Sequence, residues 1–323
     1  MEENTQYVYF KGKRIPVIDG RLDLSKYPFT SLTEIKCLDE IESLIELNLN
    51  YGKLEGVFKY ENLQDLEGLF INHGFLKDIS PISRFKNLKK LTMSSNPLTD
   101  ISPIKHLEKL EILDISSLKT RQFNVVNSLS RLRELHMENM GPVPGQEGKK
   151  LRGIPCLDNL KDLRELYLSR NEIKRIEELC QFKRLEVLHL SYNQIETLDG
   201  IEDNTKLREL KIDHNKIRDL GGISNLKNLN TLNFMNNEIN DLKPLRGLKN
   251  LRELYLYENQ LETLDGLEQC ELLETLYVSW NEIKNVEAIL ELPNIKELAI
   301  LDNPVPADQY NLMKEHFTYL QVW

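Results

Sequence analysis

The sequence of 323 residues contains no long hydrophobic run. None of its apolar stretches approaches the roughly 20 residues that a membrane-spanning helix requires. The N-terminal segment MEENTQYVYFKGKRIP also lacks the apolar core of a secretory signal peptide. We therefore expect a cytoplasmic protein that does not insert into a membrane.

Positive charge is scarce as well. The 42 lysines and arginines are outnumbered by 51 aspartates and glutamates, which gives a formal net charge of -9. Nucleic acids and anionic membrane surfaces are bound by basic surfaces. The charge balance therefore predicts neither a nucleic-acid partner nor a membrane partner.

Cysteine is rare, and its spacing excludes the common metal and redox motifs. The four cysteines are Cys37, Cys156, Cys180 and Cys270, and no two of them form a C-x-x-C pair. Zinc ribbons and thioredoxin-like motifs are thereby excluded. Because the four lie far apart along the chain, we expect reduced thiols in a reducing compartment.

The sequence does contain a long internal repeat, which is the feature to seek first. Ten of the eleven steps between successive L-x-x-L-x-L motifs are 22 residues long, and the remaining step is 31. Nine extra residues therefore lie between the fifth and sixth motifs. The motifs begin at Leu44, Leu66, Leu88, Leu110, Leu132, Leu163, Leu185, Leu207, Leu229, Leu251, Leu273 and Ile295.

Each repeat combines two periodicities. In LRELYLSRNEIKRIEELCQFKR, which starts at Leu163, Leu166 and Leu168 alternate with polar residues as in a short strand. The apolar residues that follow are three positions apart, which is typical of a tight 3₁₀ turn. One such turn cannot bury its own apolar residues, so the turns must stack into a solenoid.

An asparagine follows the strand in most turns, and its amide can bond the backbone at the bend. It is regular only in the C-terminal half, so we expect the N-terminal half to be less regular. The series comprises Asn96, Asn171, Asn193, Asn215, Asn237, Asn259, Asn281 and Asn303.

The pattern predicts three parts. Residues 1–18 form an N-terminal cap, a hairpin with strands at Tyr7–Phe10 and Ile15–Ile18. Residues 19–305 form thirteen turns, the first of them degenerate, with the insertion at about 141–149. Residues 306–323 form a helical cap, with Tyr310, Met313 and Phe317 on one face and Trp323 packed nearby. Solenoids need such caps because their ends expose the core.

These motifs resemble the 22-residue class of leucine-rich repeats. DLRELYLSRN and GIEDNTKLREL resemble the repeats of phosphatase regulators, whereas DISPI, at Asp78–Ile82 and Asp100–Ile104, is similar to bacterial internalins. The resemblance implies an α/β fold: a leucine-rich-repeat solenoid, shaped as a horseshoe or gently curved arc. Its parallel β-sheet would be concave and its convex segments short and 3₁₀ or helical.

The resemblance also implies a function class. We expect a non-enzymatic protein-binding scaffold or adaptor whose partner is another protein. Two narrower alternatives are a regulatory subunit of a type-1-like protein phosphatase, bound to the catalytic subunit, and an internalin-like surface adhesion module. The repeat motif defines the scaffold and leaves the partner open.

The expected binding surface is the concave face, whose outward residues alternate with the buried leucines. Exposed aromatic side chains are typical of interface hot spots. The alternative is that the rings only stack on one another across strands. The candidate partner-binding residues are Tyr167, His189, Tyr192, His214, Met235, Tyr255, Tyr257, Tyr277 and Trp280.

Acidic residues recur on the same face. Either they pair with the arginines that precede them along a solvated edge, or they form an acidic rim that steers a basic partner. They are Glu46, Glu134, Glu165, Glu209, Glu253 and Glu297.

One polar cluster raises the question of catalysis. His189, Glu209, Lys211, Asp213 and His214 fall on two adjacent turns, where they could bind a metal or supply a base. The sequence has no H-E-x-x-H, Walker or nucleophile-elbow motif, and an open sheet offers no closed pocket. We therefore expect polar surface residues, no enzyme activity and no cofactor or metal.

Overall fold

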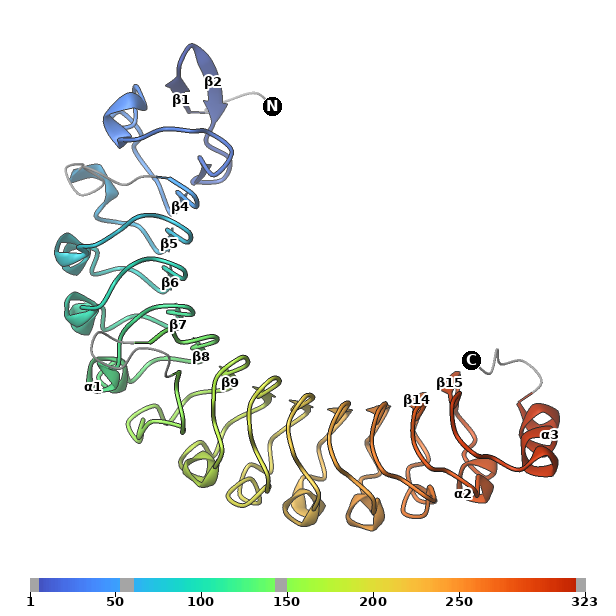
Figure 1. Ribbon diagram of the computed structural model, residues 1–323. Helices are drawn as coiled ribbons and strands as arrows, with labels where there is room; N and C mark the ends of the chain where they lie inside the picture. The colour runs from blue at the N-terminus through green and yellow to red at the C-terminus, as the bar shows by residue number, and fades with distance from the viewer. Residues whose placement is uncertain (1–5, 53–60, 143–149, 318–323) are drawn as a thin grey trace. The chain divides into compact units, whose positions relative to one another are not determined.

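The computed structural model describes residues 6–52, 61–142 and 150–317. They divide between two compact units. The first unit comprises residues 1–150 and 156–163, and the second comprises residues 151–155 and 164–323, apart from the ranges outside this description. Each unit is a stack of similar turns (Figure 1).

The first unit opens with an antiparallel hairpin, formed by β1 and β2. Six parallel strands follow and pair in sequence order, each in register with the next. The strands are β1 (Tyr7–Phe10), β2 (Lys13–Pro16), β3 (Arg21–Asp23), β4 (Glu46–Asn48), β5 (Gly68–Phe70), β6 (Lys90–Thr92), β7 (Ile112–Asp114) and β8 (Glu134–His136).

The second unit continues the same design with seven parallel strands. Each strand is three residues long, with a buried leucine between two partly exposed residues or, at β15, one partly and one fully exposed. The strands are β9 (Glu165–Tyr167), β10 (Val187–His189), β11 (Glu209–Lys211), β12 (Thr231–Asn233), β13 (Glu253–Tyr255), β14 (Thr275–Tyr277) and β15 (Glu297–Ala299).

Short helical segments lie on the side opposite the strands in most turns (Figure 1). The α-helices of the described ranges are α1 (Phe123–Asn127), α2 (Glu287–Leu290) and α3 (Ala307–His316). The 3₁₀ segments are Leu32–Glu34, Glu61–Leu63, Ser80–Arg84, Ser102–His106, Glu177–Gln181, Gly221–Asn225 and Lys243–Leu245. Apolar residues three positions apart lie on one side of a 3₁₀ segment, and that side is buried, as the sequence predicts.

The core of each unit is a column of leucine and isoleucine side chains between the strands and the helical segments. In the turn from Leu163, the residues Leu166, Leu168, Ile173 and Ile176 are at most 1% exposed. Equivalent residues of neighbouring turns share this column, so each turn buries its apolar side chains against the next. Burial of this apolar area is the main stabilising contribution to the solenoid.

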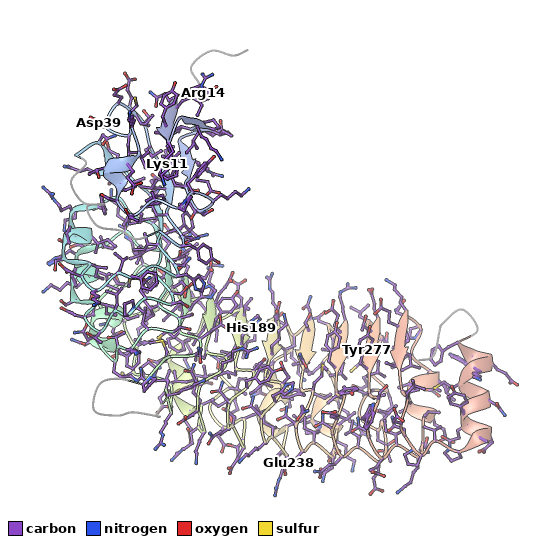
Figure 2. All side chains as sticks on the ribbon, turned by 45° about the horizontal axis from the view of Figure 1, so that its top comes forward. Lys11, Arg14, Asp39, His189, Glu238 and Tyr277 are labelled. Atoms are coloured by element: carbon purple, nitrogen blue, oxygen red, sulfur yellow. The ribbon has the colours of Figure 1, made fainter. Side chains whose placement is uncertain are left out.

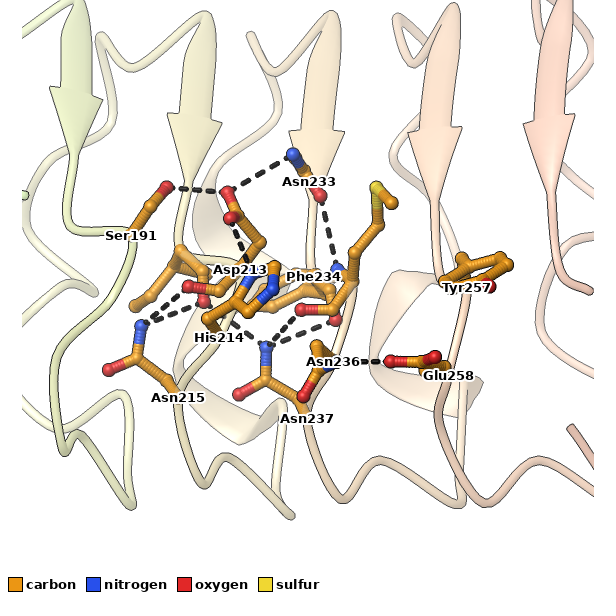
Figure 3. A network of polar contacts seen from close by, with 12 residues as sticks. Ser191, Asp213, His214, Asn215, Asn233, Phe234, Asn236, Asn237, Tyr257 and Glu258 are labelled. Atoms are coloured by element: carbon orange, nitrogen blue, oxygen red, sulfur yellow. Dashed lines mark hydrogen bonds and ion pairs between the residues drawn. The ribbon is translucent and has the colours of Figure 1, made fainter. Parts of the chain in front are cut away.

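The asparagine after each strand of the second unit bonds the backbone of two turns. Asn237 donates from Nδ2 to the carbonyls of Ile212 (3.1 Å) and Phe234 (3.0 Å) (Figure 3). Its Oδ1 accepts from the amide of Ile217 at 3.0 Å. The same arrangement recurs at Asn193, Asn215, Asn259 and Asn281. The amide thus supplies hydrogen bonds where the sheet ladder ends.

A left-handed residue directly precedes the asparagine position in each turn. Its φ lies between 48° and 65°, a region that costs side-chain-bearing residues about 1–2 kcal/mol. The residues are Tyr51, His73, Ser95, Ser117, Asn139, Arg170, Tyr192, His214, Asn236, Glu258, Trp280 and Asp302.

The predicted fold class is confirmed: a parallel sheet is combined with short 3₁₀ or helical segments in stacked turns. The second hairpin strand was predicted too late in the chain. It begins at Lys13 because Lys11 and Gly12, with φ of 47° and 79°, close a two-residue turn. Ile18 instead bridges to Arg21.

Two predictions fall partly outside the described residues: most of the 141–149 insertion, and the chain after Phe317, including Trp323. Within the described part of the C-terminal cap, Met313 and Phe317 are buried and Tyr310 is partly exposed. Over the described residues, no helix is both long and apolar enough to span a bilayer.

Candidate functional site

All nine candidate residues belong to the second unit, on or just after strands β9 to β14. We call this surface the aromatic face. Figure 2 shows two of its residues, His189 and Tyr277, on the strand side of the unit. The most exposed of the nine are Trp280, at 53%, and Tyr192, at 44%. The other seven residues are partly exposed, so each has some surface for a partner and some packed against the protein.

The rings of the aromatic face form pairs between neighbouring turns, as the stacking alternative predicts. The centroid distances are 4.7 Å for Tyr167–His189, 4.1 Å for Tyr192–His214, 5.2 Å for Tyr255–Tyr277 and 6.3 Å for Tyr257–Trp280. Stacking and exposure thus coexist, since every residue of these pairs is at least partly exposed. Pairs of this kind contribute about 0.5–1.5 kcal/mol beyond burial.

The glutamates of the face orient its tyrosines, a role that neither sequence alternative included. The hydroxyl of Tyr277 donates to Glu297 Oε2 at 2.8 Å, and that of Tyr167 donates to Glu165 Oε2 at 2.7 Å. In the same way, Tyr255 donates to Glu253 at 3.3 Å. The carboxylates therefore hold the rings at fixed angles on the sheet.

The arginines pair with a different set of carboxylates from the one the sequence suggested. Arg164 contacts Glu186 at 2.6 Å, and Arg252 contacts Glu274 at the same distance. Each glutamate lies one repeat, 22 residues, after its arginine and therefore at the same repeat position in the next turn. The predicted charge pairing therefore exists, but it involves the repeat position one residue before the glutamates that bond the tyrosines.

The phenols of Tyr255 and Tyr277 stay protonated at neutral pH. Burial and the nearby Glu253 carboxylate raise the pKa of Tyr255 to about 12. The hydrogen bond to Glu297, with burial, raises the pKa of Tyr277. A protonated phenol is a donor, so these hydroxyls keep their bonds to the glutamates across the physiological pH range.

The histidine and carboxylate cluster forms two separate networks. In the first, His189 Nε2 and Lys211 Nζ lie 2.8 Å and 2.7 Å from Glu209 Oε1. Burial raises the pKa of Glu209, but the hydrogen bonds from Lys211 and His189 outweigh burial and hold it below the ordinary 4.5. Glu209 is therefore ionised and satisfied by protein donors.

The second network surrounds Asp213, whose side chain is 13% exposed (Figure 3). Its carboxylate accepts from Ser191 Oγ at 2.5 Å and from Asn233 Nδ2 at 3.1 Å, and it lies 2.9 Å from His214 Nδ1. No group of three or more metal-ligating side chains is arranged to hold an ion within the described residues. The networks are consistent with structural support for the surface.

A depression of about 490 Å³ lies among strands β11 to β14. Met235, Tyr255 and Tyr277 provide its apolar lining. Its polar lining is Glu209, Lys211, Thr231, Asn233 and Glu253. The depression is open to solvent, which suits a protruding side chain better than an enclosed substrate.

Sequence reasoning missed one support of the aromatic face. The guanidinium of Arg170 lies 4.7 Å from the ring centroid of Tyr192, which stacks in turn on His214. All three occupy the left-handed position of successive turns. The sequence does contain a signal for this contact. Arg170 and Tyr192 occupy the same position in adjacent repeats, and stacked turns place such residues side by side, where an arginine can contact an aromatic ring.

Comparisons with known proteins identify the repeat. The family model described as leucine-rich repeats (2 copies) matches residues 161–203, 183–227, 205–247 and 227–269. No curated protein sequence matches the chain.

Solved structures extend the likeness beyond that segment. An internalin from Listeria monocytogenes is 25% identical, with a TM-score of 0.77 over 88% of this chain and 82% of its own. A leucine-rich-repeat protein of Leptospira interrogans is 21% identical, with a TM-score of 0.60 over 94% and 95%. The plant peptide hormone receptor RGFR1, in complex with RGF2, is 23% identical, with a TM-score of 0.62 over 83% and 49%.

Proposed function

This chain is a leucine-rich repeat protein, and we propose that it is a non-enzymatic scaffold that binds another protein on the aromatic face of its second unit. Repeat solenoids present extended surfaces to their partners. Among the similar structures, one receptor was solved in complex with RGF2. That likeness supports protein binding as the general function.

The observation that carries the proposal is the position of Trp280. Its backbone is left-handed, with φ of 60°, where glycine or asparagine is favoured, and 53% of the residue is exposed. An exposed tryptophan there contributes little to folding. Tryptophan and tyrosine are the residues that most often dominate binding energy at interfaces.

The test is an affinity measurement on the full chain. Affinity purification from the native host with mass spectrometry identifies the partner, and titration then gives its affinity for the variants. Trp280→Ala combined with Tyr255→Ala is expected to weaken binding more than ten-fold, or about 1.4 kcal/mol. Folding should be retained, because alanine meets the same left-handed backbone as tryptophan.

Tyr51 provides the matched control. It occupies the same repeat position in the first unit, with φ of 65° and 68% exposure, and stacks on His73 at 5.0 Å. Tyr51→Ala should leave the affinity within two-fold of the original. Equal losses in both variants, or no loss at Trp280 and Tyr255, would remove the aromatic face as the binding site.

A surface adhesion module is the second candidate, because an internalin is 25% identical over most of both chains. We propose a cytoplasmic location for the scaffold, because its four cysteines are free. Surface labelling of intact host cells would distinguish an adhesion module from this cytoplasmic scaffold. A phosphatase regulator has no support among these matches.

A further inference from the structure

The strand surface of the second unit over β12 to β15, which continues the aromatic face by one turn, differs from the rest in charge. Each turn contributes four positions to this surface, two on the strand and two just after it, and all of these residues except the buried Ser279 are at least partly exposed. Over β12 to β15 these positions carry four carboxylates and neither lysine, arginine nor histidine. The sixteen residues are Thr231, Asn233, Met235, Asn236, Glu253, Tyr255, Tyr257, Glu258, Thr275, Tyr277, Ser279, Trp280, Glu297, Ala299, Leu301 and Asp302.

Cations at the edge of this surface already have protein partners. Arg252 and Lys296 both contact the carboxylate of Glu274, at 2.6 Å and 2.5 Å. On the N-terminal side, Lys211 contacts Glu209 at 2.7 Å. The carboxylates of Glu253 and Glu297 accept hydrogen bonds from tyrosine hydroxyls, and within the described ranges neither forms an ion pair, so their negative charge is not neutralised there.

Aromatic rings and carboxylates alternate on this surface in the manner that suits a guanidinium. Tyr257 and Trp280 lie 6.3 Å apart at an angle of 50°, and Tyr255 and Tyr277 line the depression beside them. A guanidinium stacks on an aromatic ring while its N–H groups bind a carboxylate in the same plane. An ammonium gains less from such a site because it is compact and strongly hydrated.

We propose that the face of β12 to β15 binds a basic segment of the partner protein, with an arginine side chain against Tyr255, Tyr257, Tyr277 and Trp280. This rests on the proposed function and specifies its partner. The guanidinium enters the depression and takes Glu253 or Glu297 as its acceptor. The tyrosine hydroxyls hold these carboxylates in place before binding, which reduces the entropy lost on association.

The geometry favours a segment that crosses the strands. Neighbouring strands of a sheet lie about 4.8 Å apart, so Glu253 and Glu297, two turns apart, are separated by roughly 10 Å along the stack. An extended chain advances about 3.3 Å per residue. A segment lying across β13 to β15 therefore presents basic side chains to both carboxylates within three or four residues.

The experiment selects random twelve-residue peptides, displayed on phage, against the immobilised full chain. Arginine is expected to be enriched in the selected peptides. The best of them is then synthesised with citrulline in place of arginine, which keeps the shape and removes the charge. Citrulline should weaken binding at least ten-fold.

Two protein variants of equal charge locate the site. Glu253→Gln with Glu297→Gln keeps acceptors for the tyrosine hydroxyls and should weaken peptide binding about ten-fold. Glu196→Gln with Glu262→Gln removes the same charge from exposed positions outside the face and should change it less than two-fold. Equal losses in the two variants would show attraction to net charge alone and would overturn the proposal.

A second outcome separates this inference from the proposed function. Selected peptides that lose binding in Trp280→Ala but carry no excess of arginine would overturn the basic partner and leave the aromatic face as a binding surface. Peptides insensitive both to Trp280→Ala and to the paired glutamate change would overturn both. Arginine enrichment with loss in both of these variants supports both.

Discussion

Single asparagine residues link the turns of this solenoid. Each buried amide bonds carbonyls of two successive turns, and its oxygen accepts an amide proton of the preceding turn. In the first unit, glycine replaces asparagine at position 74, where an added Cβ would lie 2.9 Å from Asn96 Oδ1. The second unit is therefore regular because an asparagine in each of its turns makes the same hydrogen bonds to the neighbouring turn.

Removing one of these amides should destabilise the chain strongly. Asn259 is 9% exposed and makes hydrogen bonds to Phe234, Leu256 and Ile239. Asn259→Ala leaves buried backbone groups without partners and should lower the free energy of unfolding by about 3 kcal/mol. Denaturant unfolding measures the effect. The neighbouring exposed Gln260→Ala should change it by less than about 0.5 kcal/mol, and a similar effect of both would contradict the account.

One core asparagine should behave in the opposite way. Asn204 is fully buried at the repeat position filled by Phe182, Leu226 and Leu248 in other turns. Its Oδ1 has no hydrogen-bond partner among the described residues. Asn204→Leu should raise the free energy of unfolding by about 1 kcal/mol, because a buried unsatisfied oxygen is removed and apolar volume is added. A loss of stability would mean that its Nδ2 bonds to Leu179 and Phe182 outweigh that gain.

His136, in β8, should make stability depend on pH. Burial lowers its pKa, but hydrogen bonds with Glu138 and Glu134 and the charge of Asp114 outweigh burial, so the pKa is raised above 6.5. A raised pKa stabilises the fold fully below pH 6.5, and this contribution is lost as pH rises through the folded-state value. His136→Gln should therefore flatten the fall in melting temperature between about pH 6.5 and pH 8.5. An unchanged slope would contradict this role.

At the scale of elements, the strands were predictable because their pattern repeats. A buried leucine at every twenty-second residue fixes both the strand and its register, since neighbouring turns place equal positions side by side. The start of β2 was not predictable from the apolar run, because the left-handed Lys11–Gly12 turn decides the pairing there. Local backbone geometry outweighed the hydrophobic pattern at that point.

The ring pairs illustrate a second limit of the sequence. The columns of the repeat predicted which residues share the aromatic face. They could not predict that Tyr277 donates to Glu297 in the next turn while Tyr255 donates to Glu253 in its own, because side-chain rotamers decide between the two acceptors.

The C-terminal helix α3 packs its buried side against the last turns and supports them as a cap. Met313 is fully buried, whereas the adjacent Leu312 is 47% exposed. Met313→Ala should lower the free energy of unfolding by about 2–4 kcal/mol, because the end of the core loses its cover. Leu312→Ala is the matched control and should cost less than about 0.5 kcal/mol in the same denaturant titration. Equal costs would show that α3 does not act as a cap.

At the scale of the whole molecule, two units of one repeat design carry different surfaces. Among the described residues, the strand surface of the first unit has one stacked pair of exposed rings, Tyr51 and His73, whereas that of the second carries four ring pairs and the acidic surface over β12 to β15. The scaffold follows from the repeat, and the partner follows from the residues between the leucines. This difference is why we assign binding to the second unit.

Site-specific photo-cross-linking to the native partner tests that assignment most directly. A benzoylphenylalanine is placed at Trp280 in one full-length chain and at Tyr51 in another, so that both probes occupy the same left-handed, exposed repeat position. We expect the partner to be cross-linked efficiently from position 280 and not from position 51. Cross-linking from position 51 alone would contradict the central claim that the aromatic face of the second unit holds the partner.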